Sequence, residues 1–257
     1  MKNIDISGFG NLGNFIVKLS NAIKIALFYN YNVIVPNHPY INTTYIVINN
    51  NVNLDNEKIT DPNGFFYKTK IKNIDMILFK KNTLKTVEIL KSCFAIKNEV
   101  QLDNNDLLIH IRSSDIFGVN PHPSYLTPPL SYYVNIINKN NFNEIYLIAE
   151  DRINPCINKL LELYPKIKFK IQSLEEDVKL ILGAKNVVMG FGTFIPSLLL
   201  VSDNIKKLYK PSYMNNDELD ILNRIIKVFN IELSVYKTRM TPWKNTLEQR
   251  KFMLTYK

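Results

Sequence analysis

The second half of the chain alternates short apolar runs with longer segments whose apolar residues recur at helical spacing. The short runs predict strands at residues 107–111, 144–149, 168–171, 186–189 and 207–209. The longer segments predict helices at residues 129–138, 155–164, 174–183 and 193–201. Because strands and helices alternate, this pattern predicts a doubly wound α/β domain with a parallel sheet.

The first part of the chain shows a shorter version of the same alternation. It predicts one βαβ unit, made of a strand, a glycine-rich turn, a helix and a second strand, at residues 2–7, 8–13, 14–30 and 32–35. The pattern is weaker between residues 37 and 82, where short β-like pieces at 45–48 and 64–67 stand between Asn-rich loops. A further helix is predicted at residues 84–94.

A polar connection at residues 97–105 separates the two patterns and predicts a domain boundary. We therefore expect an N-terminal α/β domain at 1–102, a second α/β domain at 103–212, and a C-terminal helical segment at 213–257. That last segment predicts one helix at 217–229 and another after Pro242. Two Rossmann-like units of this kind would face a central cleft, into which the carboxyl ends of both sets of strands open.

The composition is that of a folded globular protein. Of the 257 residues, 46% are hydrophobic and 21% are charged, which excludes disordered, collagen-like and coiled-coil proteins. The formal net charge of +9 favours an anionic partner. Lysines are scattered over all segments, however, and no compact basic run is present, so we do not expect nucleic acid as a partner.

Cysteine usage and the length of apolar runs bear on the compartment. Cys93 and Cys156 form no C-x-x-C pair, so we expect neither a disulfide framework nor a thiolate metal site. No signal-peptide-like segment opens the sequence, and no apolar run approaches the roughly 20 residues that span a bilayer. The expectation is a cytoplasmic protein without an integral membrane segment, and the oligomeric state is left open.

The turn after the first predicted strand has a G-x-G-x-x-G spacing, formed by Gly8, Gly10 and Gly13. Such glycines let main-chain N–H groups approach a phosphate at the start of a helix. No acidic residue ends the following strand, as one does in dinucleotide-binding folds. The alternative is a tight turn in which Asn14 caps the helix.

A polar cluster ends the first strand of the second predicted domain. His110 and Arg112 stand two positions apart, so they point to the same side of an extended strand at its carboxyl end. An arginine there can bind a diphosphate through two hydrogen bonds and stabilise a departing phosphate. In the alternative, His110 is a core residue and Arg112 pairs with Asp115 to close the loop.

Two more strand ends carry groups that suit a ligand. Gly192 and Thr193 follow the fourth predicted strand, where the next helix begins. The first N–H groups of that helix could bind a phosphate. In the alternative, Thr193 is an ordinary N-cap of the helix. Glu150 and Asp151 follow the second predicted strand, where they either accept N–H groups and hydroxyls of a nucleoside or cap the next helix. Together the three strand ends predict a binding site at one edge of the sheet.

Metal and nucleophile chemistry lack their usual signatures. His38, His110 and His122 occur in no H-x-x-x-H or H-E-x-x-H spacing, and no D-x-D follows a strand. A G-x-S-x-G motif and a P-loop are absent, and neither cysteine has a histidine nearby in the sequence. We therefore expect no metal and no cofactor.

Two elements resemble motifs of a known family. The run Gly10-Asn11-Leu12-Gly13-Asn14 is similar to the G-x-L-G-N-Q opening of α-1,2-fucosyltransferases, with Phe15 in place of the glutamine. The run from His110 to Asp115 is similar to the H-x-R-x-G-D element that these enzymes share with α-1,6- and protein O-fucosyltransferases. Ser114 stands there where glycine is commoner.

Further runs follow in the order found in that family, so the resemblance extends over roughly residues 8–210. Ala149-Glu150-Asp151 resembles an A-T-D strand end. Asp177 followed by Gly192-Thr193-Phe194 resembles the late D…(S/G)-T-F element that binds the nucleotide diphosphate. The segment 122–133 resembles fucosyltransferase-like proteins of large DNA viruses and protists, which implies the host cytoplasm if the chain is viral.

The resemblance implies an inverting, metal-independent GT-B enzyme that transfers fucose from GDP-fucose to a glycan acceptor. Domain 1–102 would bind the acceptor and domain 103–212 the nucleotide sugar. Arg112 would bind the diphosphate and Asn14 would lie near the reacting sugar. By their proximity to the cleft, Asp115 and His122 are candidates for the general base, and Asp115 could equally orient Arg112.

The departures at Phe15 and Ser114 leave a different nucleotide sugar as an alternative donor. A rival function is a non-catalytic nucleotide-sugar or glycan binding module, whose cleft binds a ligand but lacks a general base. A second rival, a nucleic-acid-binding protein, rests on the charge alone.

Overall fold

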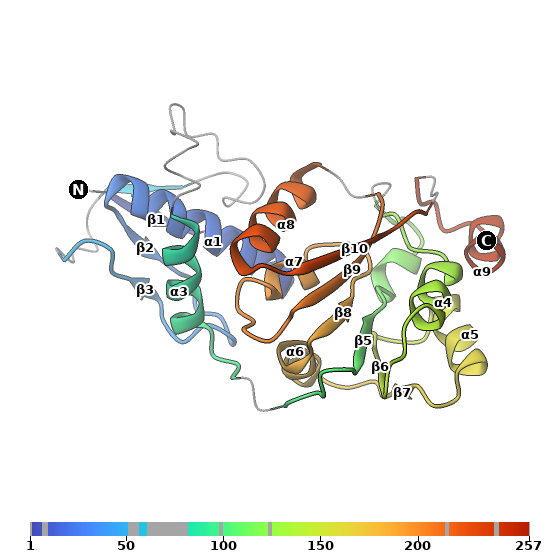
Figure 1. Cartoon of the computed structure of the whole chain (residues 1–257). Helices are drawn as coiled ribbons and strands as arrows, with labels where there is room; N and C mark the ends of the chain where they lie inside the picture. Colours follow the sequence, from blue (N-terminus) through green and yellow to red (C-terminus); the bar gives the residue numbers. More distant parts are fainter. Residues whose placement is uncertain are drawn as a thin grey trace. The chain divides into compact units, whose positions relative to one another are not determined.

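The computed structural model describes residues 2–6, 10–50, 57–60, 82–97, 100–122, 125–213, 216–238 and 242–256 (Figure 1). The chain divides into two compact units. One contains Met1–Lys97 and Pro196–Val201, and the other contains Asn98–Ile195 and Ser202–Lys257. Each unit combines a sheet containing parallel strands with helices, so the predicted α/β class is confirmed.

Across the part of the second unit that the structure describes, six strands form an all-parallel sheet in the order β10-β9-β8-β5-β6-β7. Its strands are β5 (Leu107–His110), β6 (Ile145–Ile148), β7 (Lys168–Phe169), β8 (Asn186–Val188), β9 (Lys207–Pro211) and β10 (Glu232–Tyr236). The chain builds outward from β5 to β7, returns to the other side of β5 for β8, and continues to the opposite edge. The topological switch point therefore lies between β5 and β8.

Alternate residues of these strands face two different layers. Leu107 and Ile109 of β5 belong to one buried cluster, whereas Leu108 between them is buried outside it. Three helices contribute to that cluster: α4 (Leu130–Asn138), α5 (Pro155–Leu163) and α9 (Leu247–Thr255). Figure 1 shows α6 (Leu174–Gly183) and α8 (Asn216–Phe229) on the other side of the sheet. The sheet is therefore covered on both faces, as a doubly wound fold requires.

In the described residues of the first unit, four strands form a sheet in the order β3-β2-β1-β4. Its elements are β1 (Lys2–Asp5), α1 (Leu12–Tyr29), β2 (Asn32–Ile34), β3 (Tyr45–Ile46), β4 (Glu57–Ile59) and α3 (Thr83–Cys93). The predicted βαβ unit is confirmed, because β1 and β2 are parallel and α1 connects them. β3 is antiparallel to β2, and β4 adds a parallel strand that the sequence pattern did not predict.

Two predicted elements are shorter than expected. The helix predicted at 193–201 is limited to α7 (Phe194–Leu198), because the N–H groups of Leu200 and Val201 turn back to carbonyls three residues earlier. The strand predicted at 168–171 is limited to β7, which pairs only with β6 at the sheet edge. The strand predicted at 64–67 lies outside the described residues. None of the described helices is long and apolar enough to span a bilayer.

Candidate functional site

The ends of β5 and β8 meet closely at the switch point of the six-stranded sheet. Gly190 follows β8, and a Cβ added there would stand 3.2 Å from the carbonyl oxygen of His110 and 3.5 Å from the nitrogen of Arg112. The missing side chain therefore allows the two strand ends to approach each other. Because ligands of open α/β sheets bind at the carboxyl ends beside such a point, this edge is the candidate site.

Arg112 leaves the end of β5 and is held by two acidic side chains. Its Nη2 donates to both carboxylate oxygens of Asp115, at 2.8 and 2.9 Å. Its Nη1 lies 3.9 Å from Oε1 of Glu150. The Arg112 side chain is only 17% exposed, against 50% for Asp115 and 49% for Glu150. The positive charge is thus fixed in place, and its acidic partners reach the solvent.

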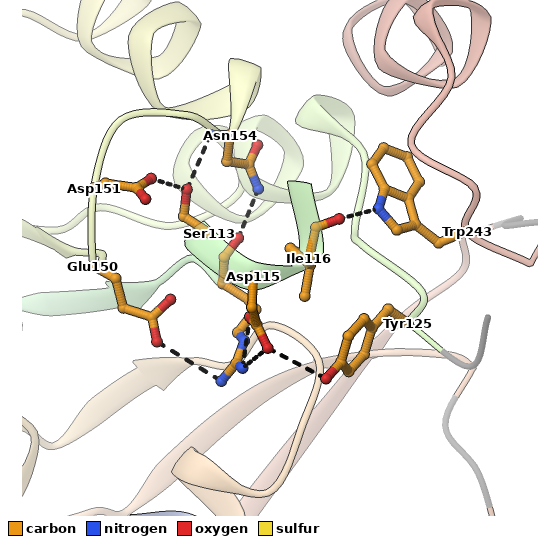
Figure 2. A network of polar contacts seen from close by, with 9 residues as sticks. Ser113, Asp115, Ile116, Tyr125, Glu150, Asp151, Asn154 and Trp243 are labelled. Carbon is orange, nitrogen blue, oxygen red and sulfur yellow. Dashed lines mark hydrogen bonds and ion pairs between the residues drawn. The ribbon is translucent and has the colours of Figure 1, made fainter. Parts of the chain in front are cut away.

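The main chain beside Arg112 is anchored to the loop that follows β6 (Figure 2). The Ser113 hydroxyl donates to the carboxylate of Asp151 and accepts from the main-chain nitrogen of Asn154, 3.0 Å away. The Asn154 side chain donates to the carbonyl of Arg112 at 2.9 Å and accepts from the nitrogen of Cys156 at 3.0 Å. Asn154 therefore caps α5 while it holds the strand end that carries the arginine.

Asp151 belongs to this anchoring network rather than to the cap of α5. Its Oδ1 accepts from the main-chain nitrogen of Ile153 at 2.8 Å as well as from the hydroxyl of Ser113. The predicted alternative, in which Asp151 or Glu150 caps the helix, is wrong because Asn154 takes that position. Glu150 instead faces Arg112.

An aromatic group adjoins the ion pair. The Tyr125 hydroxyl donates to Oδ2 of Asp115 at 3.4 Å. The Tyr125 ring lies edge to face against Phe191, with 5.9 Å between the ring centroids, and 5.7 Å from the exposed His122. Phe191 belongs to the glycine-rich turn after β8. Tyr125 thus connects that turn to Asp115 and brings His122 close to the same edge.

Burial raises the pKa values of two carboxyl groups at this edge. Desolvation raises the pKa of Glu150, and the charge of Arg112 opposes that shift. In the first turn of α6, desolvation raises the pKa of Asp177 to about 6, although Gln172 donates to its Oδ1 at 2.9 Å and opposes the shift. Glu150 also raises the pKa of Asp177, so the two carboxylates are within electrostatic reach of each other. Perturbed carboxyl groups of this kind are typical of functional sites.

His110 packs the switch point from the inside. The side chain is buried, and desolvation together with the positive charge of Arg112 lowers its pKa to about 3. Its ring lies 5.2 Å from that of Phe194, the first residue of α7. A neutral imidazole in this position supports the packing of the strand end, which was the alternative interpretation of His110.

Two residues beside the site adopt positive φ. Ser114 begins the 3₁₀ helix η1 (Ser114–Phe117) with a φ of 54°, a conformation that favours glycine. Gly192 has a φ of 108° and precedes Thr193. Thr193 is followed by α7, which has only five residues, so its helix dipole is small.

The predicted site residues of the first unit lie at the start of α1. Gly13 is buried in the first turn, Asn14 follows it half-buried, and Gly10 is exposed just before the helix. The prediction that Asn14 caps this helix is wrong, because the carbonyl of Asn11 already accepts from the nitrogen of Phe15 at 3.0 Å. Asn11 therefore occupies the N-cap position. Gly8 lies outside the described residues.

Phe15 is a core residue of the first unit. Its side chain is fully buried, and its ring stacks on that of His38 with 4.3 Å between centroids and 4° between planes. Burial lowers the pKa of His38. Phe15 and His38 therefore pack together in the core of the first unit.

The structure gathers part of the predicted site at one edge of the six-stranded sheet. Arg112, Asp115, Glu150 and Asp151 are linked there by ion pairs or through Ser113. Gly10, Gly13 and Asn14 belong to the other unit. Among the residues that the structure describes, no three His, Cys, Asp or Glu side chains are grouped so that they could hold a metal ion.

Sequence reasoning missed several residues that shape this edge. Asn154 had a usable signal, because an asparagine directly before a proline, here Pro155, is typical of an N-cap followed by proline at the first helical position. Tyr125 and Gln172 had no such signal in the sequence. Each lies in a loop without periodicity, from which it contacts a carboxylate.

No protein-family model matches the sequence, and a search of curated proteins finds no significant match. We therefore infer function from the geometry of the switch point and from the motifs that lie there.

Proposed function

We propose that this protein is an inverting, metal-independent glycosyltransferase that transfers fucose from GDP-fucose to a hydroxyl of a glycan acceptor. The observation that supports this best is Arg112, a fixed guanidinium at the carboxyl end of β5 beside the glycine-rich turn after β8. Its planar N–H donors and permanent charge suit a diphosphate. The resemblance of the runs around Arg112, Asp177 and Thr193 to fucosyltransferase motifs supports the choice of donor.

In the proposed reaction, the acceptor oxygen attacks the anomeric carbon while the bond from that carbon to the diphosphate oxygen breaks. The diphosphate leaves with the bonding electron pair, and Arg112 stabilises the charge that develops on it. Asp115 and Asn154 already fix the side chain and the main chain of this arginine, so little reorganisation is needed during the reaction. The N–H groups around Gly192 and Thr193 add donors to the diphosphate.

The carboxylates along the same edge would bind the nucleoside. Glu150 and Asp177 lie at the carboxyl end of β6 and in the first turn of α6, and each has a raised pKa. When ionised, such groups accept N–H groups of a base or ribose hydroxyls. We propose that they select the nucleoside, and that the buried His110 supports Phe194 and the turn from behind.

Asp115 is better suited to orient Arg112 than to act as the general base. Both of its oxygens accept from Arg112, and Oδ2 also accepts from Tyr125. His122 is exposed and contacts Tyr125, which reaches Asp115, so we propose that this imidazole takes the proton of the acceptor hydroxyl.

We further propose a GT-B organisation for the two α/β units. The first unit would supply the acceptor side, with Asn14 near the reacting sugar. What supports this is the parallel pairing of β1 with β2 and β4, and the glycine turn at the start of α1. Parallel strands joined through a helix are the Rossmann-like element from which both halves of such enzymes are built.

The proposal is tested by measuring GDP release from GDP-fucose with a panel of glycan acceptors, with and without EDTA. Arg112→Ala should lower kcat by roughly 100-fold or more, because it removes a donor to the leaving group. Arg152→Ala is the matched control, since this exposed arginine lies on the neighbouring loop and packs over Phe169 instead. The control and EDTA treatment should leave the rate unchanged.

Other outcomes would replace the proposal. Full activity of Arg112→Ala, or complete loss with EDTA, would overturn the mechanism. Binding of GDP-fucose without turnover of any acceptor would instead indicate a non-catalytic nucleotide-sugar or glycan binding module. A thermal shift with UDP or TDP sugars and none with GDP sugars would indicate a different donor.

A further inference from the structure

Side chains from the C-terminal segment bind the end of η1. The indole Nε1 of Trp243 donates to the carbonyl of Ile116 (Figure 2). The side-chain nitrogen of Asn245 donates to the carbonyls of Phe117 and Gly118, at 2.7 and 2.8 Å. Three consecutive carbonyls are thus bound by two side chains that are more than 120 positions away in the sequence.

Arg250 fixes the orientation of the Asn245 amide. Its Nε donates to Oδ1 of Asn245 at 2.8 Å. Because a guanidinium has donors only, the amide oxygen must face it and the amide nitrogen must face the carbonyls of η1. Arg250 also lies over the ring of Phe117 at 5.4 Å, and that ring packs edge to face on Trp243 at 5.3 Å. We name Trp243, Asn245 and Arg250 the C-terminal clamp.

The clamp acts on the segment that carries Asp115. The nitrogen of Gly118 donates to the carbonyl of Asp115 at 3.1 Å, so a single tight turn joins the clamped carbonyls to this residue. The Asp115 carboxylate in turn holds Arg112. Trp243 is 1% exposed, so a shift of η1 would leave its indole N–H buried without a partner, which is costly. The clamp therefore resists movement of Asp115 away from the arginine.

The same loop is held at its other end by the network of Ser113 and Asn154. We propose that the C-terminal clamp is a positioning element for the pair of Arg112 and Asp115, so that Trp243 and Asn245 set the affinity of the site for a diphosphate without touching it. This inference rests on the proposed function of Arg112. It assigns to the C-terminal segment a role in ligand binding that its own sequence does not show.

The test compares GDP and guanosine binding to the full-length protein by titration calorimetry. Trp243→Phe keeps an aromatic ring and removes the N–H donor. Asn245→Gly removes the amide and accommodates the φ of 57° at this position. Thr246→Ala is the matched control, because its hydroxyl accepts from the nitrogen of Gln249 at 3.2 Å and caps α9 without contacting η1.

Both clamp variants should lose about 5- to 20-fold in affinity for GDP, with guanosine affinity unchanged, because only the diphosphate uses the positioned arginine. Thr246→Ala should lower Tm and leave both affinities unchanged. Equal GDP affinity in wild type and clamp variants, or parallel losses for GDP and guanosine, would overturn the positioning role. Absence of GDP binding by wild type, or equal binding by Arg112→Ala, would overturn the proposed function and this role with it.

Hydrogen exchange gives a second measurement that needs no ligand. Amides of residues 113–118 should exchange faster in Trp243→Phe and Asn245→Gly than in wild type, because the carbonyls that anchor this turn lose their partners. In Thr246→Ala they should exchange at the wild-type rate. Unchanged exchange in both clamp variants would contradict the inference even if their stability falls.

Discussion

The side-chain amide of Asn154 binds the main chain of Arg112. Its nitrogen donates to the Arg112 carbonyl oxygen at 2.9 Å, while its oxygen accepts the N–H of Cys156 at the start of α5. One residue thus combines the cap of a helix with the support of the strand end that presents the arginine. Its removal should affect both stability and ligand affinity.

Asn154→Ala should lower the free energy of unfolding by about 1 to 2 kcal/mol, the usual cost of losing an N-cap. It should also weaken GDP binding, because the main chain of Arg112 loses an anchor. Ser173→Ala is a suitable control, since Ser173 caps α6 in the same unit through Glu176. Urea denaturation and calorimetry should show a similar stability loss for both variants and an affinity loss for Asn154→Ala alone. Equal affinities would contradict the anchoring role.

Two adjacent tyrosines of α4 should respond oppositely to the same substitution. The buried Tyr132 hydroxyl donates to the carbonyls of Met189 at 3.0 Å and Tyr209 at 2.9 Å. The buried Tyr133 hydroxyl has no hydrogen-bond partner among the described residues. Tyr132→Phe should therefore destabilise the protein by about 1 to 2 kcal/mol, and Tyr133→Phe should stabilise it by up to about 1 kcal/mol. Denaturant unfolding checks both signs, and a destabilised Tyr133→Phe would contradict the second.

The order of elements in the second unit could be predicted because its central strands are buried on both faces. All residues of β5 are buried, so apolar side chains run almost without interruption and the strand is easily recognised. β10 lies at the edge of the sheet, and its residues Glu232 and Val235 are exposed. Its pattern is therefore too weak to identify a strand, although it pairs with β9 along its whole length.

The candidate site could be predicted only where its residues are close in sequence or end a strand. The pairing of Arg112 with Asp115 was one of the two interpretations of the motif, since three positions separate them. The contacts of Tyr125 and Trp243 with the same loop depend on tertiary packing of irregular segments. Neither residue lies in a periodic pattern of apolar residues that would indicate its element and its position, so these contacts could not be predicted from the sequence alone.

Ser114→Gly should stabilise the protein. Ser114 has a φ of 54°, and this left-handed conformation costs an L-residue roughly 1 to 2 kcal/mol. Glycine avoids that cost, but its greater conformational freedom in the unfolded chain offsets part of the gain. The net gain should be up to about 1 kcal/mol. Asn30→Gly gives a reference for the effect of glycine at a positive φ, because Asn30 has a similar φ of 59° at the end of α1. A lower Tm for Ser114→Gly would show that the serine side chain stabilises the turn.

His110 should make the fold sensitive to acid. Desolvation and the charge of Arg112 lower its pKa from 6.5 to about 3, so between these values the unfolded chain binds a proton that the folded protein does not. Stability is therefore fully present above pH 6.5 and falls as the pH falls below it. Between pH 6.5 and pH 5 this residue should cost about 2 kcal/mol. His110→Gln should flatten the dependence, and an unchanged slope in urea denaturation would contradict the assignment.

Asp177 should have the opposite dependence on pH. Desolvation raises the pKa of Asp177 from 3.8 to about 6, so the folded protein binds this proton more tightly than the unfolded chain does. The contribution of Asp177 to stability is therefore present below pH 3.8 and is lost as the pH rises through 6. Asp177→Asn should therefore raise the free energy of unfolding at pH 7 by about 1 to 2 kcal/mol, with no gain near pH 4.

The effect of Asp177→Asn on GDP binding separates a role of this carboxylate in ligand binding from a role in stability alone. If the carboxylate binds the nucleoside, as proposed, Asp177→Asn should weaken GDP binding while it stabilises the fold. Such a loss of function with a gain in stability is common when a functional group is replaced. Glu176→Gln, one position earlier, is the control. The Ser173 main chain and hydroxyl lower the pKa of Glu176, so this variant should lose stability at pH 7 and keep its GDP affinity. A stabilised Asp177→Asn with unchanged GDP affinity would remove this carboxylate from the proposed site.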